Sequence, residues 1–153
     1  MKRVTLPSLF LLICIFSSCI ARNMTFGNGK DWIPAEFNAK TDILMIEASL
    51  PLKGQDRRME EYMKAHYPYK FEFVRYRDIM DREDKFADAK LYRFVFMYEP
   101  SKVYNGQGYS SAMDWYFYDR MKDKRNPPTS KGSFSRIVTF KGAVNTIIQD
   151  AGK

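Results

Sequence analysis

Both cysteines of this 153-residue chain lie within its first nineteen residues, so the rest of the chain must fold without a disulfide. Two basic residues open the chain, an apolar run is densest over residues 9–16, and Ser17 and Ser18 directly precede Cys19. This order is typical of a secretory signal, and the run is shorter than the roughly 20 apolar residues that span a bilayer. We therefore expect an exported protein from which residues 1–18 are removed.

Cys14 leaves with the signal, and Cys19 then stands at the amino end of what remains. The folded part has no thiol for a disulfide, a zinc–thiolate site, an iron–sulfur cluster or a cysteine nucleophile. It must be stabilised by an apolar core alone. About 130 residues suffice for this, because a domain of that size buries nearly 70% of its unfolded surface.

The segment from Phe16 to Cys19 resembles a bacterial lipobox, in which small residues precede a cysteine that is lipidated and becomes the first residue. The resemblance implies a diacylated thioether on Cys19, usually with a third acyl chain on its amine, and hence the membrane as a partner. Ile20 stands where an acidic residue often retains such proteins at the inner membrane. We expect an outer-membrane anchor facing the periplasm. The alternative is ordinary cleavage after Ala21 and release as a secreted or periplasmic protein.

The lipobox-like opening and the Tyr- and Phe-rich, cysteine-free body resemble small uncharacterised lipoproteins of the Bacteroidetes type. This resemblance implies a location and no activity.

Residues 19–40 are expected to form a lipidated tether followed by a strap. Gly27 and Gly29 make its first half flexible. Trp32, Ile33 and Phe37 are too apolar for a free linker, so this second half is expected to lie against the domain in extended form. The single α/β domain is expected over residues 41–153.

The first half of the domain reads as strand, helix and strand. The unbroken apolar run Ile43–Ile46 suits a strand that is buried on both faces. Apolar side chains at helical spacing predict a helix over residues 55–67, and residues 71–76 read as a second strand. This order favours parallel pairing of the two strands.

The second half reads as a hairpin and a helix. Residues 78–90 form a charged connection, and residues 91–98 are a strong strand that Pro100 is expected to limit. A glycine-rich loop over residues 101–111 leads to an alternating strand over residues 114–120, antiparallel to the preceding one. After a polar loop, an apolar stripe at helical spacing predicts a helix. The stripe consists of Ile137, Phe140, Val144, Ile147 and Ile148. The prediction is a two-layer α/β sandwich in the order β-α-β-β-β-α, with a mixed four-stranded sheet covered by both helices.

Charge and composition exclude several function classes. The formal net charge of +7 falls by two when Lys2 and Arg3 are removed with the signal. This mild excess is not the footprint of a nucleic-acid-binding protein. The lone His66 cannot build the usual zinc site, so neither a metal nor another cofactor is expected, although His66 could act as a general base. Acidic and basic residues alternate over residues 75–85, which indicates a self-neutralised loop.

Two groups of aromatic residues are candidates for binding. The even positions from Tyr92 to Tyr98 could stack sugar rings, but their phenylalanines favour a core role. The exposed candidates lie in the 101–111 loop and are Tyr104, Asn105, Gln107 and Tyr109. Tyrosine and asparagine on an adaptable loop make a good contact surface.

Three functions stay open at this point. The first is a lipid-anchored binding or interaction module of the cell envelope, without catalysis, whose partner is an envelope protein or a glycan. The second is an envelope hydrolase that acts on glycan or peptide through Asp, Tyr and His66. The third is an exported inhibitor that plugs a partner's cleft with the 101–111 loop. We favour the first.

Overall fold

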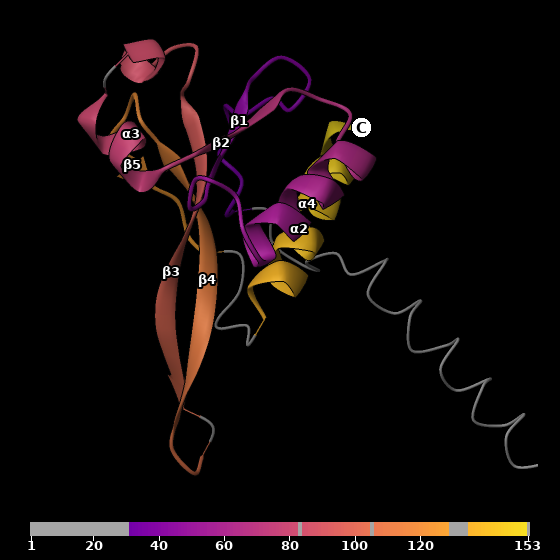
Figure 1. Ribbon diagram of the computed structural model, residues 1–153, viewed down its shortest axis with the longest axis vertical. Helices are drawn as coiled ribbons and strands as arrows, with labels where there is room; N and C mark the ends of the chain where they lie inside the picture. The colour runs from indigo at the N-terminus through magenta and orange to yellow at the C-terminus, as the bar shows by residue number, and fades with distance from the viewer. Residues whose placement is uncertain (1–30, 83, 105, 129–134, 153) are drawn as a thin grey trace, which may run out of the picture.

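The computed structural model describes residues 31–82, 84–104, 106–128 and 135–152. Within these ranges, five strands form one sheet in the order β2-β1-β3-β4-β5 (Figure 1). The elements, in chain order, are β1 Leu44–Glu47, α2 Gln55–His66, β2 Phe71–Val74, α3 Tyr76–Asp81, the 3₁₀ helix η2 Asp84–Ala87, β3 Phe94–Tyr104, β4 Tyr109–Asp119, β5 Lys124–Arg125 and α4 Arg136–Ala151.

The sheet is mixed, as predicted, but it has one strand more than the predicted four. Strand β1 pairs in parallel with β2 and with β3, whereas β3 with β4 and β4 with β5 are antiparallel. The additional strand β5 has only two residues, Lys124 and Arg125, which pair with Asp119 and Tyr118. Two polar residues carry no period-two pattern, so this strand could not be predicted from the sequence.

The apolar run at the start of the domain forms most of β1, which lies between β2 and β3 in the sheet. Leu44, Met45 and Ile46 have no solvent exposure at all. Leu44 and Ile46 belong to the core cluster on one face, and Met45 belongs to the cluster on the other. The prediction of a strand buried on both faces is confirmed.

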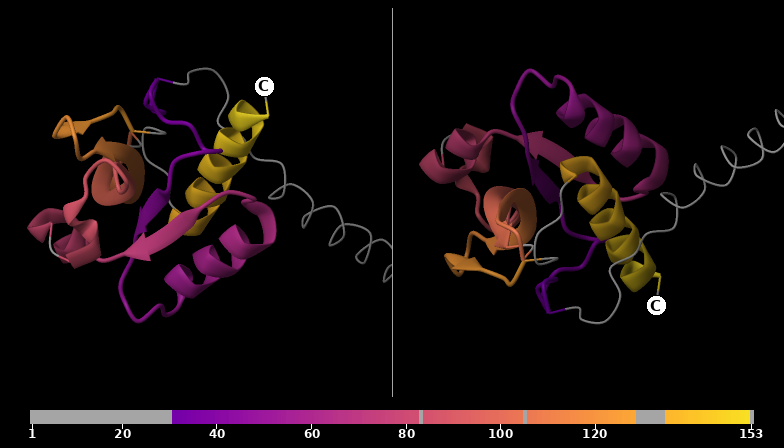
Figure 2. Two further views of the ribbon diagram at one scale, coloured as in Figure 1. Left: turned by 90° about the horizontal axis from the view of Figure 1, so that it is seen from above. Right: turned by 90° about the horizontal axis from the view of Figure 1, so that it is seen from below.

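Helices α2 and α4 cover the first face, and Figure 2 shows them on the same side of the sheet. Met59 and Met63 of α2 and Val144 of α4 are fully buried against this face. The ion pair between Glu60 and Lys64, at 2.9 Å, lies on the solvent side of α2. The helical periodicities thus placed the core-facing sides of both helices correctly.

The two-layer arrangement that we predicted is wrong, because α3 and η2 cover the opposite face. Ile79 of α3 and Phe86 of η2 are buried against Met45, Val95 and Met97. Charged residues dominate this segment and obscured its two apolar anchors. Two anchors seven residues apart allow one short helical turn in the charged connection, which is too little to predict a layer on this face.

The strap packs against the first face, as expected, although in turns rather than in extended form. The Trp32 side chain is only 3% exposed, and its ring stacks on Phe117 at a centroid distance of 5.9 Å. A turn follows, in which the N–H of Phe37 donates to the carbonyl of Pro34 at 3.0 Å. Pro34 is the first residue of this turn and supplies the carbonyl that closes it.

Candidate binding surface on the β3–β4 arm

The loop predicted over residues 101–111 is mostly strand. β3 continues to Tyr104 and β4 begins at Tyr109, in continuous register from Phe94 opposite Asp119 to Tyr104 opposite Tyr109. Pro100 lies inside β3 instead of ending it. The predicted strand also began too early, because Leu91 belongs to a turn in which its N–H donates to the Asp88 carboxylate at 3.2 Å.

The outer parts of these strands project from the domain as a two-stranded arm, defined here as residues 99–104 and 109–114. Within the described residues, β1 pairs with β3 only as far as Phe96, and β5 pairs with β4 only at Tyr118 and Asp119. Figure 1 shows the arm extending well beyond the helices and the rest of the sheet. The arm therefore presents both of its faces and its tip outside the body.

The tip carries an exposed pair of tyrosines. Tyr104 and Tyr109 lie directly opposite each other, with ring centroids 5.4 Å apart and side chains 62% and 75% exposed. The Tyr104 hydroxyl donates to the carbonyl of Gly106 at 3.2 Å, and Gly106 has a φ of 87°. Gln107 is exposed beside them, whereas Asn105 lies outside the described residues. Three of the four candidate residues thus share one exposed tip.

The root of the arm is held on one face by Arg136 at the start of α4. Its guanidinium lies 3.6 Å from the Tyr98 ring centroid and 2.7 Å from Asp56 Oδ1. Asp56 is 5% exposed and also accepts the N–H of Ser49 at 3.0 Å. This buried pair joins α2, α4 and β3. Removing one partner of such a pair leaves an uncompensated charge, so it holds the three elements in one arrangement.

Two further contacts hold the root. The Glu47 carboxylate accepts the N–H of Tyr98 at 3.4 Å, and burial raises the pKa of Glu47 above its ordinary value. Arg125 lies 3.9 Å from the Tyr116 ring centroid and forms an ion pair with Glu99. The position of the arm relative to the body is therefore fixed by contacts from both of its strands.

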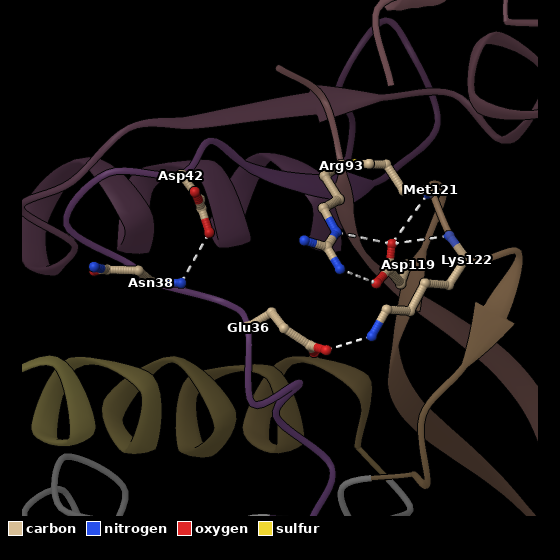
Figure 3. A network of polar contacts seen from close by, with 7 residues as sticks. All are labelled: Glu36, Asn38, Asp42, Arg93, Asp119, Met121 and Lys122. Carbon is tan, nitrogen blue, oxygen red and sulfur yellow. Dashed lines mark hydrogen bonds and ion pairs between the residues drawn. The ribbon is translucent and has the colours of Figure 1, made fainter. Parts of the chain in front are cut away.

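The opposite end of the hairpin is tied to the strap by the network in Figure 3. Arg93 forms a two-pronged hydrogen bond with Asp119, at 3.0 and 2.7 Å, and Asp119 also accepts the N–H groups of Met121 and Lys122. Burial works against the charged form of Asp119, but the Arg93 hydrogen bond and the main-chain donors outweigh it and lower the pKa of this carboxyl. Lys122 forms an ion pair with Glu36 of the strap.

Arg120 is a buried cation that fixes the turn before β3. It is 1% exposed and donates to the carbonyls of Phe86 and Tyr92 at 2.6 and 2.7 Å. Burial lowers the pKa of this guanidinium. Its partners are main-chain carbonyls of a turn, so we assign it a structural role.

The remaining candidates do not converge on a reaction centre. His66 is exposed at the last position of α2, with its ring 4.4 Å from that of Tyr62. A cavity of about 510 Å³ beside α3 and one of about 340 Å³ between the strap and α4 are not lined by His66.

Charged side chains at the larger cavity pair with each other. Arg75 binds Asp78 at 2.8 Å, and Lys85 binds Glu72. These pairs agree with the expectation of a self-neutralised segment. Within the described ranges there is no group of three or more His, Cys, Asp or Glu residues arranged to hold a metal ion.

Sequence reasoning missed the residues that hold the arm. Asp56 and Arg136 are 80 positions apart, and no local pattern links them. Local patterning also hid the arm, because Pro100 and Lys102 interrupt the series of aromatic residues at even positions from Tyr92 to Tyr98. Proline is tolerated in a strand where its missing N–H would point to a free edge.

Comparison with protein-family models, curated proteins and solved structures found no match to this chain. In the part of the chain that the structure describes, none of the helices has the length and apolar character needed to cross a membrane.

Proposed function

We propose that the protein is a lipid-anchored interaction protein of the bacterial cell envelope, which binds a partner protein through the tip of its arm. The observation that carries the proposal is the exposed pair Tyr104 and Tyr109 at the end of a strand pair that projects from the body. Tyrosines combine a large apolar ring with a polar hydroxyl and are enriched among residues that contribute most to binding.

The construction of the arm supports this proposal. Binding is weakened when flexible groups must be ordered, so a surface held in place before contact binds more tightly. The antiparallel ladder, the stacking of Arg136 on Tyr98 and the ion pair between Arg125 and Glu99 hold the arm in place. The tip is therefore presented to a partner at little entropic cost.

The proposed anchor is Cys19, which lies outside the described residues. Each buried methylene contributes about 0.8 kcal/mol, so two or three acyl chains give firm attachment. The packed chain includes Trp32, which leaves twelve residues from Cys19 to Lys30 before the first described residue. Fully extended, such a segment spans at most about 40 Å. The domain would thus work close to the membrane.

The binding proposal is tested by pull-down from solubilised envelope with the anchored protein as bait. We expect Tyr104→Ala together with Tyr109→Ala to weaken capture of the partner by about tenfold or more, an effect of about 1.4 kcal/mol. The melting temperature should stay nearly unchanged, because both side chains are exposed. His66→Ala is the control and should capture the partner as the parent does. Equal capture by the double tyrosine variant would exclude the tip.

The anchor is tested separately. Expressed in a bacterium, the protein should partition into detergent and gain mass corresponding to acyl chains. Cys19→Ser should release it or stop its processing. A mature protein with a free amino terminus at Arg22 would show that ordinary cleavage occurs instead.

A second candidate function is inhibition of the partner, and the convex shape of the arm favours it. A projecting hairpin can enter a cleft that a flat surface cannot reach. If the captured partner is an enzyme, its turnover should fall on addition of the parent protein and recover with the double tyrosine variant. An unaffected turnover would leave binding without inhibition.

A further inference from the structure

The two strands of the arm offer different edges to the solvent. The carbonyl of Phe117 accepts the N–H of Asn126, and Arg120 and Arg93 are hydrogen-bonded across the hairpin. Because backbone direction alternates along a strand, the N–H and C=O groups of Tyr109, Ser111 and Met113 point away from β3. Among the described residues, no main-chain group forms a hydrogen bond with these outward-pointing N–H and C=O groups.

The edge of β3 is closed to a further strand. Its outward positions include Tyr98, whose N–H is already taken by Glu47, and Pro100, which has no N–H. Glu99 and Lys102 add charges of the kind that protect free edges. In β4, by contrast, the segment from Tyr109 to Met113 contains neither a charge nor a proline. Within the part of the chain that the structure describes, strand pairing is thus blocked at β3 and open at β4.

We propose that the open edge of β4 pairs with the same edge of a second copy of this chain, forming an antiparallel dimer through the arms. A two-fold axis at Ser111 would place Ser111 opposite Ser111 and Tyr109 opposite Met113. All three outward positions then receive partners, with about six main-chain hydrogen bonds between the copies. This inference goes beyond the proposed function, because it rests on the main-chain edge and not on the tip.

The side chains fit this self-pairing. Tyr109 is 75% exposed in the single chain and would lie beside Met113 of the second copy, a favourable contact between a thioether and an aromatic ring. In the same register Asp114 lies opposite Gly108, so no like charges face each other. A second copy therefore matches the edge in hydrogen bonding and brings no like charges together.

Cysteine cross-linking tests the register in the full-length chain. Opposed residues of a hydrogen-bonded antiparallel pair have Cα atoms about 5.5 Å apart, within the range of roughly 4.4–6.8 Å that a disulfide spans. Ser111→Cys should give a disulfide-linked dimer on a non-reducing gel. Lys102→Cys is the matched control, because Lys102 lies opposite Ser111 on the closed edge. The parent chain shows the background from Cys14 and Cys19.

Proline substitution tests the same contact without oxidation. Ser111→Pro removes an outward N–H and should raise the dimer dissociation constant by about tenfold or more, measured by light scattering on the detergent-solubilised protein. Lys102→Pro should leave that constant unchanged, and circular dichroism confirms that both variants fold. A monomeric parent, equal cross-linking at positions 111 and 102, or an intact dimer of Ser111→Pro would each overturn the inference. None of these readouts depends on partner capture by Tyr104 and Tyr109.

Discussion

Replacing Trp32 with alanine is expected to remove much of the stability of the domain, although Trp32 precedes the first strand by twelve residues. Its side chain is 3% exposed and lies on Phe117 and Phe96, with centroid distances of 5.9 and 6.0 Å. A buried aromatic side chain removes about 150–250 Å² from water, which at about 25 cal/mol per Å² corresponds to roughly 4–6 kcal/mol. Measured losses for such truncations are about 3–5 kcal/mol.

We therefore expect Trp32→Ala to lower the free energy of unfolding by about 4 kcal/mol and the melting temperature by about 15 °C. Urea unfolding of the processed protein measures the first quantity. The chain has two tryptophans, so the fluorescence of the buried Trp115 still reports unfolding in the variant.

Tyr76→Ala is the control for this experiment, because Tyr76 is an aromatic residue with 55% exposure. Its loss should stay within about 0.5 kcal/mol. A loss below about 1 kcal/mol for Trp32→Ala would refute the packing of the strap. Residues 31–40 would then contribute little to the stability of the domain.

Three further predictions concern the core and the buried carboxylates. Leu44→Ala and Ile147→Ala should each lower the free energy of unfolding by about 2–5 kcal/mol in urea titrations, and losses under roughly 0.5 kcal/mol at both sites would mean that the core is misplaced. The pKa of Asp119 is lowered in the folded state, so its ionised form stabilises the fold. This stabilisation is present above the unfolded pKa of about 3.9 and is lost as the pH falls through the folded pKa. Asp119→Asn should cost about 3 kcal/mol at neutral pH by leaving Arg93 unpaired, and the loss should shrink in acid; a loss that is independent of pH would contradict this. The pKa of Glu47 is raised in the folded state, so the free energy of unfolding should decline as the pH rises from about 4.3 through the folded pKa. Unfolding measured across this pH range should show that Glu47→Gln removes this decline.

Sequence periodicity predicted those helices and strands in which the spacing of apolar residues indicates which sides face the core. The run Ile43–Ile46 favoured a strand buried on both faces, and β1 buries Leu44, Met45 and Ile46 completely. The helical spacing of Met59 and Met63 placed both on the core side of α2. The parallel pairing of β1 and β2 followed from the helix between them. These features depend on residues close together in the chain, which is why they could be predicted.

The features that hold and shape the arm depend on distant residues or on exceptions to local rules. The pair formed by Asp56 and Arg136 joins two helices that are far apart in sequence. Glycine, serine and asparagine over residues 101–111 favour a loop, yet the ladder with the opposite strand overrides this preference. Strand preference depends more on cross-strand partners than on the residue itself, so the length of the arm was beyond local reasoning.

The two strands of the arm are equally long and in register, but they differ in the residues that protect a free edge from pairing with another strand. β3 carries a proline, two charges and a carboxylate-capped N–H, and each of these opposes pairing with another strand. β4 has one charge, Asp114, opposite Glu99 at the root of the arm, and neither a charge nor a proline from Tyr109 to Met113. An arm that only presented its tip would gain from protection on both edges, because an open edge invites aggregation. Protection on one side alone indicates that the other side is used, and it separates the two roles for experiment: Tyr104 reports on the tip, and Ser111 reports on the edge.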